Sequence, residues 1–147
     1  MIIDTVSYNL RIWLRSAAHC AAGATTDGEL DHEKAAECRR CWSHVGDWST
    51  EEGAAKGNEC LDTYEPEFRE MCGEKMSAWE AEQSAENRDA VDECWEEANM
   101  RRIAAKCADA GSHELGMLCI FKHTSDNMKY AREQVFGEKY NILDQPK

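Results

Sequence analysis

The chain has 147 residues, which suits a single domain, and its 29 acidic and 17 basic side chains give a net charge of −12. This balance argues against nucleic-acid binding. No apolar run reaches the roughly 18 residues that a membrane span requires.

Apolar side chains at helical spacing predict an all-α fold of about six helices, with no segment at strand period. The first helix is expected over 2–22 and the second over 30–45. The third is expected to follow a capping box formed by Ser49 and Glu52, and to run to about residue 64.

The fourth helix is expected over 66–82, because Pro66 is tolerated in a first helical turn. The fifth is expected over 86–109 and the sixth from Ser112 to Gly137, with the polar segment 124–126 as a candidate break. Residues 1–137 then form one disulfide-stapled helical domain, and 138–147 form an extended C-terminal tail.

The N-terminal segment does not read as a secretory signal. Asp4, Asn9, Arg11 and Arg15 interrupt any apolar h-region. The apolar stripe of this segment, with its arginines and serines, is instead similar to a mitochondrial presequence.

Negative charge is concentrated in the middle of the chain. Residues 51–97 contain 16 Asp and Glu against 4 Lys and Arg, while the rest of the chain contains 13 of each kind. Such a segment predicts either a solvated helical face or a surface that binds a basic protein partner.

The chain contains eight cysteines, an even number that predicts disulfides and an oxidising compartment. Two cysteines can be joined across a helical hairpin when they lie equally far from its turn. Taken in sequence order, each pair has its midpoint in or beside a predicted turn. This sequential arrangement predicts four bridges: Cys20–Cys38, Cys41–Cys60, Cys72–Cys94 and Cys107–Cys119.

A nested arrangement is the alternative, with Cys60 paired to Cys107 and Cys72 paired to Cys94 on one hairpin. In this Cx11C…Cx12C pattern the chain resembles the coiled-coil-helix-coiled-coil-helix (CHCH) family of the mitochondrial intermembrane space, although no Cx9C occurs and Pro66 interrupts the first segment. The resemblance implies oxidative folding on import and a bracing role in respiratory complexes. The stretch from Arg15 to Cys20 is similar to a segment of an eight-cysteine complex I subunit of that family.

The one CxxC motif, at Cys38 and Cys41, is a candidate redox pair, because its two arginines would lower the thiol pKa. The same cysteines with His44 and Cys60 are a candidate zinc site. A redox CxxC usually opens a helix, however, and this one lies in the middle of a predicted helix. A structural role is therefore favoured for both cysteines.

Other candidate catalytic groups are adjacent in sequence rather than suitably spaced. His19 and Cys20 point about 100° apart on a helix, so they cannot simply pair. The carboxylate runs Glu51-Glu52 and Glu96-Glu97 are expected by chance in so acidic a chain. No catalytic residue, cofactor or metal is expected.

Five tryptophans are the remaining signal, and they predict either core packing or contacts with a partner. They are Trp13, Trp42, Trp48, Trp79 and Trp95.

These patterns lead to three hypotheses of function. The first is a non-catalytic accessory subunit of a mitochondrial inner-membrane complex, in the respiratory chain or ATP synthase, on the intermembrane-space side. Its partners would be other subunits of that complex and a basic protein at the acidic 51–97 surface. The alternative is a secreted, disulfide-rich helical carrier of an apolar ligand or a signalling protein. A thiol oxidoreductase using Cys38 and Cys41 is the third.

Overall fold

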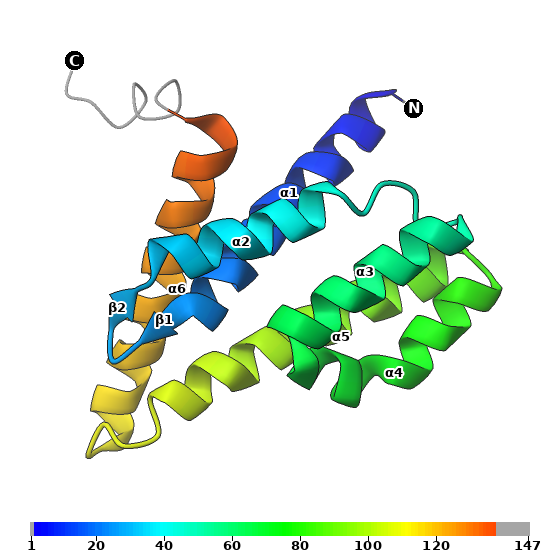
Figure 1. Cartoon of the computed structure of the whole chain (residues 1–147). Helices are drawn as coiled ribbons and strands as arrows, with labels where there is room; N and C mark the ends of the chain where they lie inside the picture. Colours follow the sequence, from blue (N-terminus) through cyan, green and yellow to red (C-terminus); the bar gives the residue numbers. More distant parts are fainter. Residues whose placement is uncertain (1, 138–147) are drawn as a thin grey trace.

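The computed structural model describes residues 2–137, and their side chains from residue 9 onward. This part of the chain is all-α, with six helices and one short hairpin of two-residue strands (Figure 1). In chain order the elements are α1 (Ile2–Ala24), β1 (Thr25–Thr26), β2 (Glu29–Leu30), α2 (His32–Ser43), α3 (Glu51–Tyr64), α4 (Pro66–Ala81), α5 (Ala85–Lys106) and α6 (His113–Phe136). The expected tail, 138–147, lies outside the described residues.

Most helices begin at a polar side chain that accepts a backbone N–H of the first turn, as N-caps do. Asp31 caps α2, Ser84 caps α5 and Ser112 caps α6. The expected cap of α3 was one residue early: Thr50 accepts the Gly53 N–H at 2.9 Å, whereas the Ser49 backbone N–H donates to Asp47.

The turn after α1 is a tight hairpin in which Thr25 pairs with Leu30 and Thr26 with Glu29. Asp27 and Gly28 both have positive φ, of 52° and 80°. This is the Asp-Gly chemistry of a type I′ turn, which matches the twist of paired strands. The sequence predicted no strands here, because four strand residues are too few to show a period.

The sixth helix is continuous through residues 124–126, so the expected break was wrong. The segment is polar, but it contains neither glycine nor proline. Asp126 forms an ion pair with Lys122, one turn earlier, at 2.7 Å. Polar side chains that face solvent or form such pairs do not interrupt a helix.

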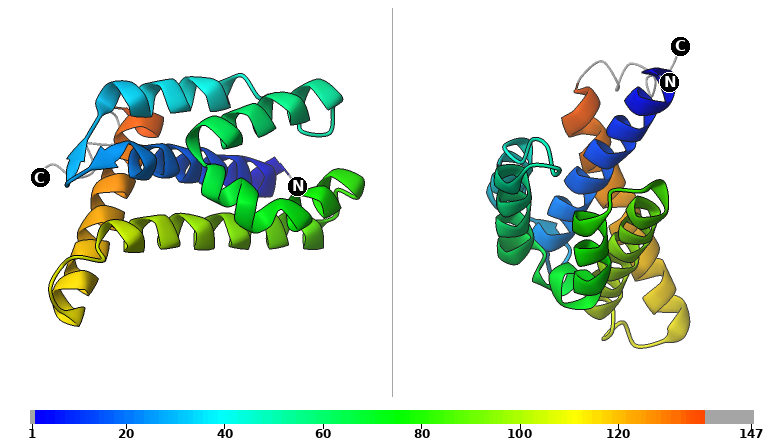
Figure 2. Two further views of the ribbon diagram at one scale, coloured as in Figure 1. Left: turned by 60° about the horizontal axis from the view of Figure 1, so that its bottom comes forward. Right: turned by 90° about the vertical axis from the view of Figure 1, so that its right-hand side faces the viewer.

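The helices form thin layers around α1, which lies between α2 on one side and α5 on the other (Figure 2). α3 follows α2, α4 packs against α5, and α6 crosses α1. The first turns of α6 project from the rest of the molecule. No helix within residues 2–137 is both long and apolar enough to cross a membrane.

Four disulfides join neighbouring helices: Cys20–Cys38, Cys41–Cys60, Cys72–Cys94 and Cys107–Cys119. These are the pairs of the sequential arrangement. The nested arrangement differs at Cys60 and Cys107, which have other partners. Pro66 begins α4 after a sharp change of direction at Glu65, so no continuous helix joins Cys60 to Cys72.

The core is divided into small clusters. The largest lies between α3, α4 and α5 and includes Leu61, Phe68, Met76 and Trp95. A smaller group, built mainly from alanines of α1, packs against Tyr130 and Ala131 of α6. The contact of α1 with α6 is therefore built largely from small side chains, whereas large apolar side chains fill the space between α3, α4 and α5.

Candidate functional site

A cleft of about 820 Å³ opens between the helices, and all five tryptophans of the chain contribute to its lining. We call it the tryptophan cleft. Its volume falls within the range of small-molecule sites, about 300–1,000 Å³. The apolar side chains that line it are Ile12, Trp13, Ala17, Trp42, Val45, Trp48, Leu61, Phe68, Met76, Trp79, Val91, Trp95 and Val135.

Each wall of the cleft comes from a different element. Trp13 is on α1, Trp42 on α2, Trp48 on the loop before α3, Trp79 on α4 and Trp95 on α5. They differ in exposure, from the buried Trp95 to Trp13, which is 64% exposed. The expected core packing is confirmed for Trp95, whereas the expected contact with a partner stays a prediction.

The indole rings of the inner wall are in mutual contact. Trp42 lies 6.3 Å from Trp48 and 5.8 Å from Trp95, measured between ring centroids, and Phe68 lies 6.1 Å from Trp95. Gly57 of α3 makes room for this wall, because a Cβ at that position would overlap the Trp48 ring. Aromatic packing of this kind is rigid and gives a pre-formed apolar surface.

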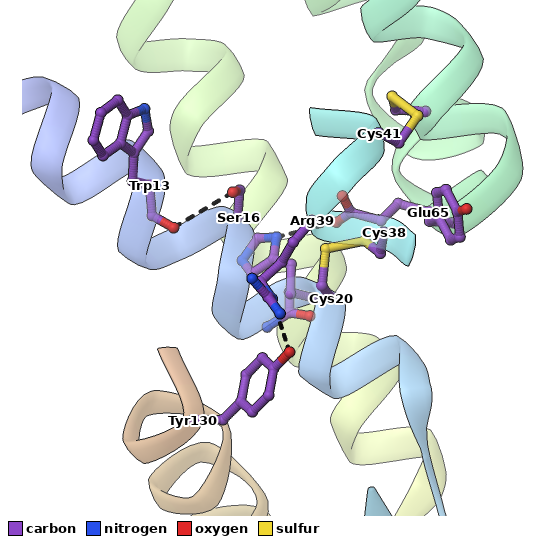
Figure 3. Close-up of a disulfide and its surroundings, with 12 residues drawn as sticks. Trp13, Ser16, Cys20, Cys38, Arg39, Cys41, Glu65 and Tyr130 are labelled. Carbon is purple, nitrogen blue, oxygen red and sulfur yellow. Dashed lines mark hydrogen bonds and ion pairs between the residues drawn. A yellow bond between two sulfur atoms is a disulfide. The ribbon is translucent and has the colours of Figure 1, made fainter. Parts of the chain in front are cut away.

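Polar groups lie around the cleft. Asn9, Ser16, Arg39, Ser43, Arg88, Asp92 and Gln134 are part of its lining. Arg39 donates to the Tyr130 hydroxyl of α6 at 2.8 Å, beside the Cys20–Cys38 bridge that joins α1 to α2 (Figure 3). Asp92 lies 3.7 Å from the Arg15 guanidinium. The cleft thus combines an apolar wall with charged groups of both signs.

Behind the cleft lies an ionic cluster centred on the buried His19 of α1. The His19 Nδ1 is 3.1 Å from Glu65 Oε1, and its Nε2 is 2.9 Å from Glu96 Oε1. Trp95 Nε1 donates to the same Glu65 oxygen at 2.9 Å. His19 is 1% exposed and Glu65 is 2% exposed. We call these four residues the His19 cluster.

Two arginines complete the surroundings of the cluster. Arg102 of α5 donates to the His19 carbonyl at 2.7 Å and to the Tyr64 carbonyl at 3.3 Å, and lies 3.9 Å from Glu65 Oε1. Arg15 donates to Glu96 at 2.9 Å and places its guanidinium 5.9 Å from the Trp95 ring. The cluster therefore links α1 and α5 to the junction of α3 and α4.

The pKa of His19 is raised and that of Glu65 is lowered, so both groups are favoured in their charged forms. Burial opposes the charged form of His19, but hydrogen bonds to Glu65 and Glu96 raise its pKa above 6.5. Burial likewise opposes the charged form of Glu65, but the His19 hydrogen bond and charge lower its pKa below 4.5. The imidazolium can then donate from both ring nitrogens.

The His19 cluster can hold neighbouring side chains in fixed positions. His19 and Glu65 are closed off from solvent and do not line the cleft, whereas Trp95 does. By holding the Trp95 indole, Glu65 fixes one wall of the cleft. From the sequence, His19 was considered only beside Cys20, and Glu65 was not singled out. No spacing signal links residues 46 positions apart.

The other candidate groups are not brought together. Cys38 and Cys41 are in two separate bridges, and the side chain of His44 contacts the Arg40 carbonyl at 2.6 Å. Within the described residues the CxxC is thus neither one redox pair nor part of a four-ligand zinc site.

The two carboxylate runs are also separated. Glu51 and Glu52 are exposed in the first turn of α3. Glu96 joins the His19 cluster, whereas Glu97 pairs with Arg101 at 2.9 Å. None of these four residues forms an acid and base pair with its neighbour.

The chain matches no protein-family model, no curated protein and no solved structure.

Proposed function

We propose that the protein is a non-catalytic carrier of a small apolar ligand, which binds in the tryptophan cleft. The observation that carries this proposal is an 820 Å³ cleft lined by all five tryptophans. A core without free space would have argued against a carrier. Sites of this kind take up most of a ligand's surface through apolar contacts and fix its orientation through a few polar groups.

The bridges support the proposal, because they hold the walls of the cleft in place. Cys20–Cys38 ties α1 to α2, Cys41–Cys60 ties α2 to α3, and Cys72–Cys94 ties α4 to α5. A pre-formed site loses less conformational entropy when it binds a ligand. Four disulfides are compatible with an oxidising compartment, which suits a secreted carrier.

Binding of a neutral apolar dye, N-phenyl-1-naphthylamine, tests the proposal. We expect saturable binding at one site, with quenching of the intrinsic tryptophan emission. Val91 lines the cleft and Leu118 lies exposed on α6, so V91W and L118W add the same indole inside and outside the site. V91W should weaken binding at least tenfold, and L118W should leave it unchanged.

Circular dichroism and disulfide mapping would establish that both variants keep the fold, since overpacking can destabilise by about 1–3 kcal/mol. Dye binding that does not saturate would contradict a carrier. Equal affinity of V91W and the unmodified protein would exclude the tryptophan cleft as the site.

A second candidate is an accessory subunit of a mitochondrial inner-membrane complex, in the respiratory chain or ATP synthase, on the intermembrane-space side. An apolar stripe on α6 favours a protein partner: Leu115, Leu118 and Phe121 are 53%, 63% and 62% exposed, at three-residue spacing. Exposed apolar groups of this kind mark interaction surfaces when they lie together.

Co-sedimentation in gently solubilised membranes tests the second candidate. The protein should migrate with a large complex, and the double variant L118E/F121E should release it. The control variant E59Q/E70Q changes the acidic 51–97 segment and leaves the stripe intact. If the stripe is the docking surface, this variant should still migrate with the complex. Migration of the unmodified protein as a free monomer would contradict this function.

A further inference from the structure

The corner where α5 meets α6 brings together three potential metal ligands. Cys107 caps the C-terminus of α5, and Cys119 and His123 lie one turn apart on α6. The two sulfur atoms and one ring nitrogen of His123 all lie within 4.8 Å of one another. Residues four apart share a helix face, so both α6 ligands can reach one ion.

We propose that reduction of the Cys107–Cys119 bridge creates a zinc site formed by the two cysteine thiolates and His123. The reductant is a small thiol such as glutathione. Two thiol molecules break the S–S bond, supply the two protons of the new cysteine thiols and leave as one disulfide. Binding of Zn²⁺ then releases both cysteine protons. This site is separate from the tryptophan cleft and does not depend on the carrier function.

The donor set and the geometry suit zinc. Two sulfurs and one imidazole nitrogen are typical ligands of this borderline-soft cation, with water or a fourth side chain completing a tetrahedron. Zn–S distances of about 2.3 Å place the two sulfurs about 3.8 Å apart. The Cα atoms of the two cysteines are 5.8 Å apart, and the imidazole nitrogen is already within 4.8 Å. Side-chain rotations are enough to reach that geometry.

A surface groove lies beside this bridge. The groove, of about 630 Å³, is lined by Cys107, Asp109 and His113, among others. In this bridge Cys107 is 5% exposed and Cys119 is half-buried. Both cysteines of Cys20–Cys38 and of Cys72–Cys94 are at most 3% exposed, whereas Cys41–Cys60 also joins a half-buried cysteine to a buried one.

Opening this bridge should disturb the fold least. It closes the shortest loop, with a sequence separation of 12 against 18 to 22 for the other three. The stabilisation expected from restricting the unfolded chain increases with loop length. The first turns of α6 project from the body and carry exposed side chains, so few buried contacts depend on the bridge.

The ligand set also balances the charge of the ion, because two thiolates and a neutral imidazole leave the zinc complex without net charge.

Graded reduction with glutathione, followed by alkylation and peptide mapping, tests the first step. Cys107 and Cys119 should be labelled before any other cysteine. If another bridge opens first under every condition, the proposal is wrong. Zinc analysis of the protein reduced only at this bridge should then give one ion per chain, against none in the fully oxidised protein. Absence of zinc from the reduced form would also overturn the site.

Variants identify the ligands. H123A should lower the zinc affinity at least tenfold, while H32A, at an exposed histidine of α2, should leave it unchanged. The double variant C107S/C119S, with the other three bridges intact, should bind no zinc. Co²⁺ offers a second readout, because thiolate coordination gives a charge-transfer absorption that unspecific surface binding lacks. Equal affinity of H123A and the unmodified protein, or stoichiometric binding by the double variant, would contradict the assignment.

Discussion

Two histidines, His19 at the centre of the molecule and His123 at the α5–α6 corner, lie in opposite electrostatic surroundings. Burial disfavours the charged form of both. His19 faces two carboxylates, and its pKa is raised; His123 lies near two lysines, and its pKa is lowered. Charged neighbours thus decide the direction of the pKa shift at His19, the more buried of the two. A carboxylate on each of its ring nitrogens outweighs the effect of desolvation.

The same contrast extends to packing. Around His19, side chains of α1 and α5 bind Glu65, the residue between α3 and α4, and Trp95 is held against the cleft. Near His123, the Cys107–Cys119 bridge joins α5 to α6, and a surface groove lies beside Cys107. We therefore expect the centre to be a fixed support, and the proposed zinc site requires that the corner change its covalent state without unfolding the rest.

The largest effect should come from E65Q, which removes the charge that pairs with His19. Breaking a buried pair by removing one partner leaves the other charge uncompensated and costs about 3–5 kcal/mol. Urea denaturation with the bridges intact measures the change in the free energy of unfolding. E97Q is the matched control, since the Glu97–Arg101 pair is exposed and worth at most about 1 kcal/mol. Similar losses in the two variants would contradict the central role of Glu65.

Removing bridges should have the next largest effect. The chain-entropy relation gives about 3.4 kcal/mol for the 22-residue separation of Cys72–Cys94 and about 2.8 kcal/mol for the 12-residue separation of Cys107–Cys119. Replacing each pair with alanine should therefore destabilise the protein more at Cys72–Cys94, where both cysteines also lie in the core. Thermal unfolding measures the order. A larger loss at Cys107–Cys119 would show that the corner supports the fold.

The smallest effects should appear in the pH dependence of stability, with opposite signs at the two histidines. The raised pKa of His19 gives a contribution that is fully present below pH 6.5 and is lost as the pH rises through the folded-state value. The lowered pKa of His123 gives a contribution that is present above pH 6.5 and is lost as the pH falls.

Glu65 sets the acid limit, because its pKa is lowered: its contribution is present above pH 4.5 and is lost as the pH falls through its folded-state value. Denaturation curves of the unmodified protein, H19Q and H123A between about pH 2 and pH 8 would measure how the free energy of unfolding changes with pH. If the free energy of unfolding changes with pH in the same way in both variants, the two histidines do not have opposite effects on stability.

Much of the fold was accessible from the sequence, because its signals are local. Apolar periodicity and polar caps predicted six helices, with errors of a few residues at their ends. The turns between them, combined with the cysteine positions, indicated the four bridges. The cap of α3 was misplaced at Ser49 because backbone geometry decides which of several neighbouring polar residues accepts the first-turn N–H. The break expected at 124–126 did not occur, because polar side chains can remain in a helix through pairs such as Lys122–Asp126.

The candidate sites were not accessible in the same way. The sequence showed five tryptophans without indicating that they surround one cleft, and it showed His19 and Glu65 without indicating that they meet. It directed attention to the CxxC at Cys38 and Cys41, whereas the three-ligand group lies at Cys107, Cys119 and His123.

The sequence by itself determined the helices and their order, because helix periodicity and turn signals act over a few residues. It also indicated the four disulfides, because the cysteines lie at matching distances from the turns. Only the tertiary structure decided which side chains share a cleft, which charges are buried together and which histidine stands beside a bridge. Those outcomes depend on the angles at which α1, α5 and α6 cross, and crossing angles come from the packing of many side chains at once.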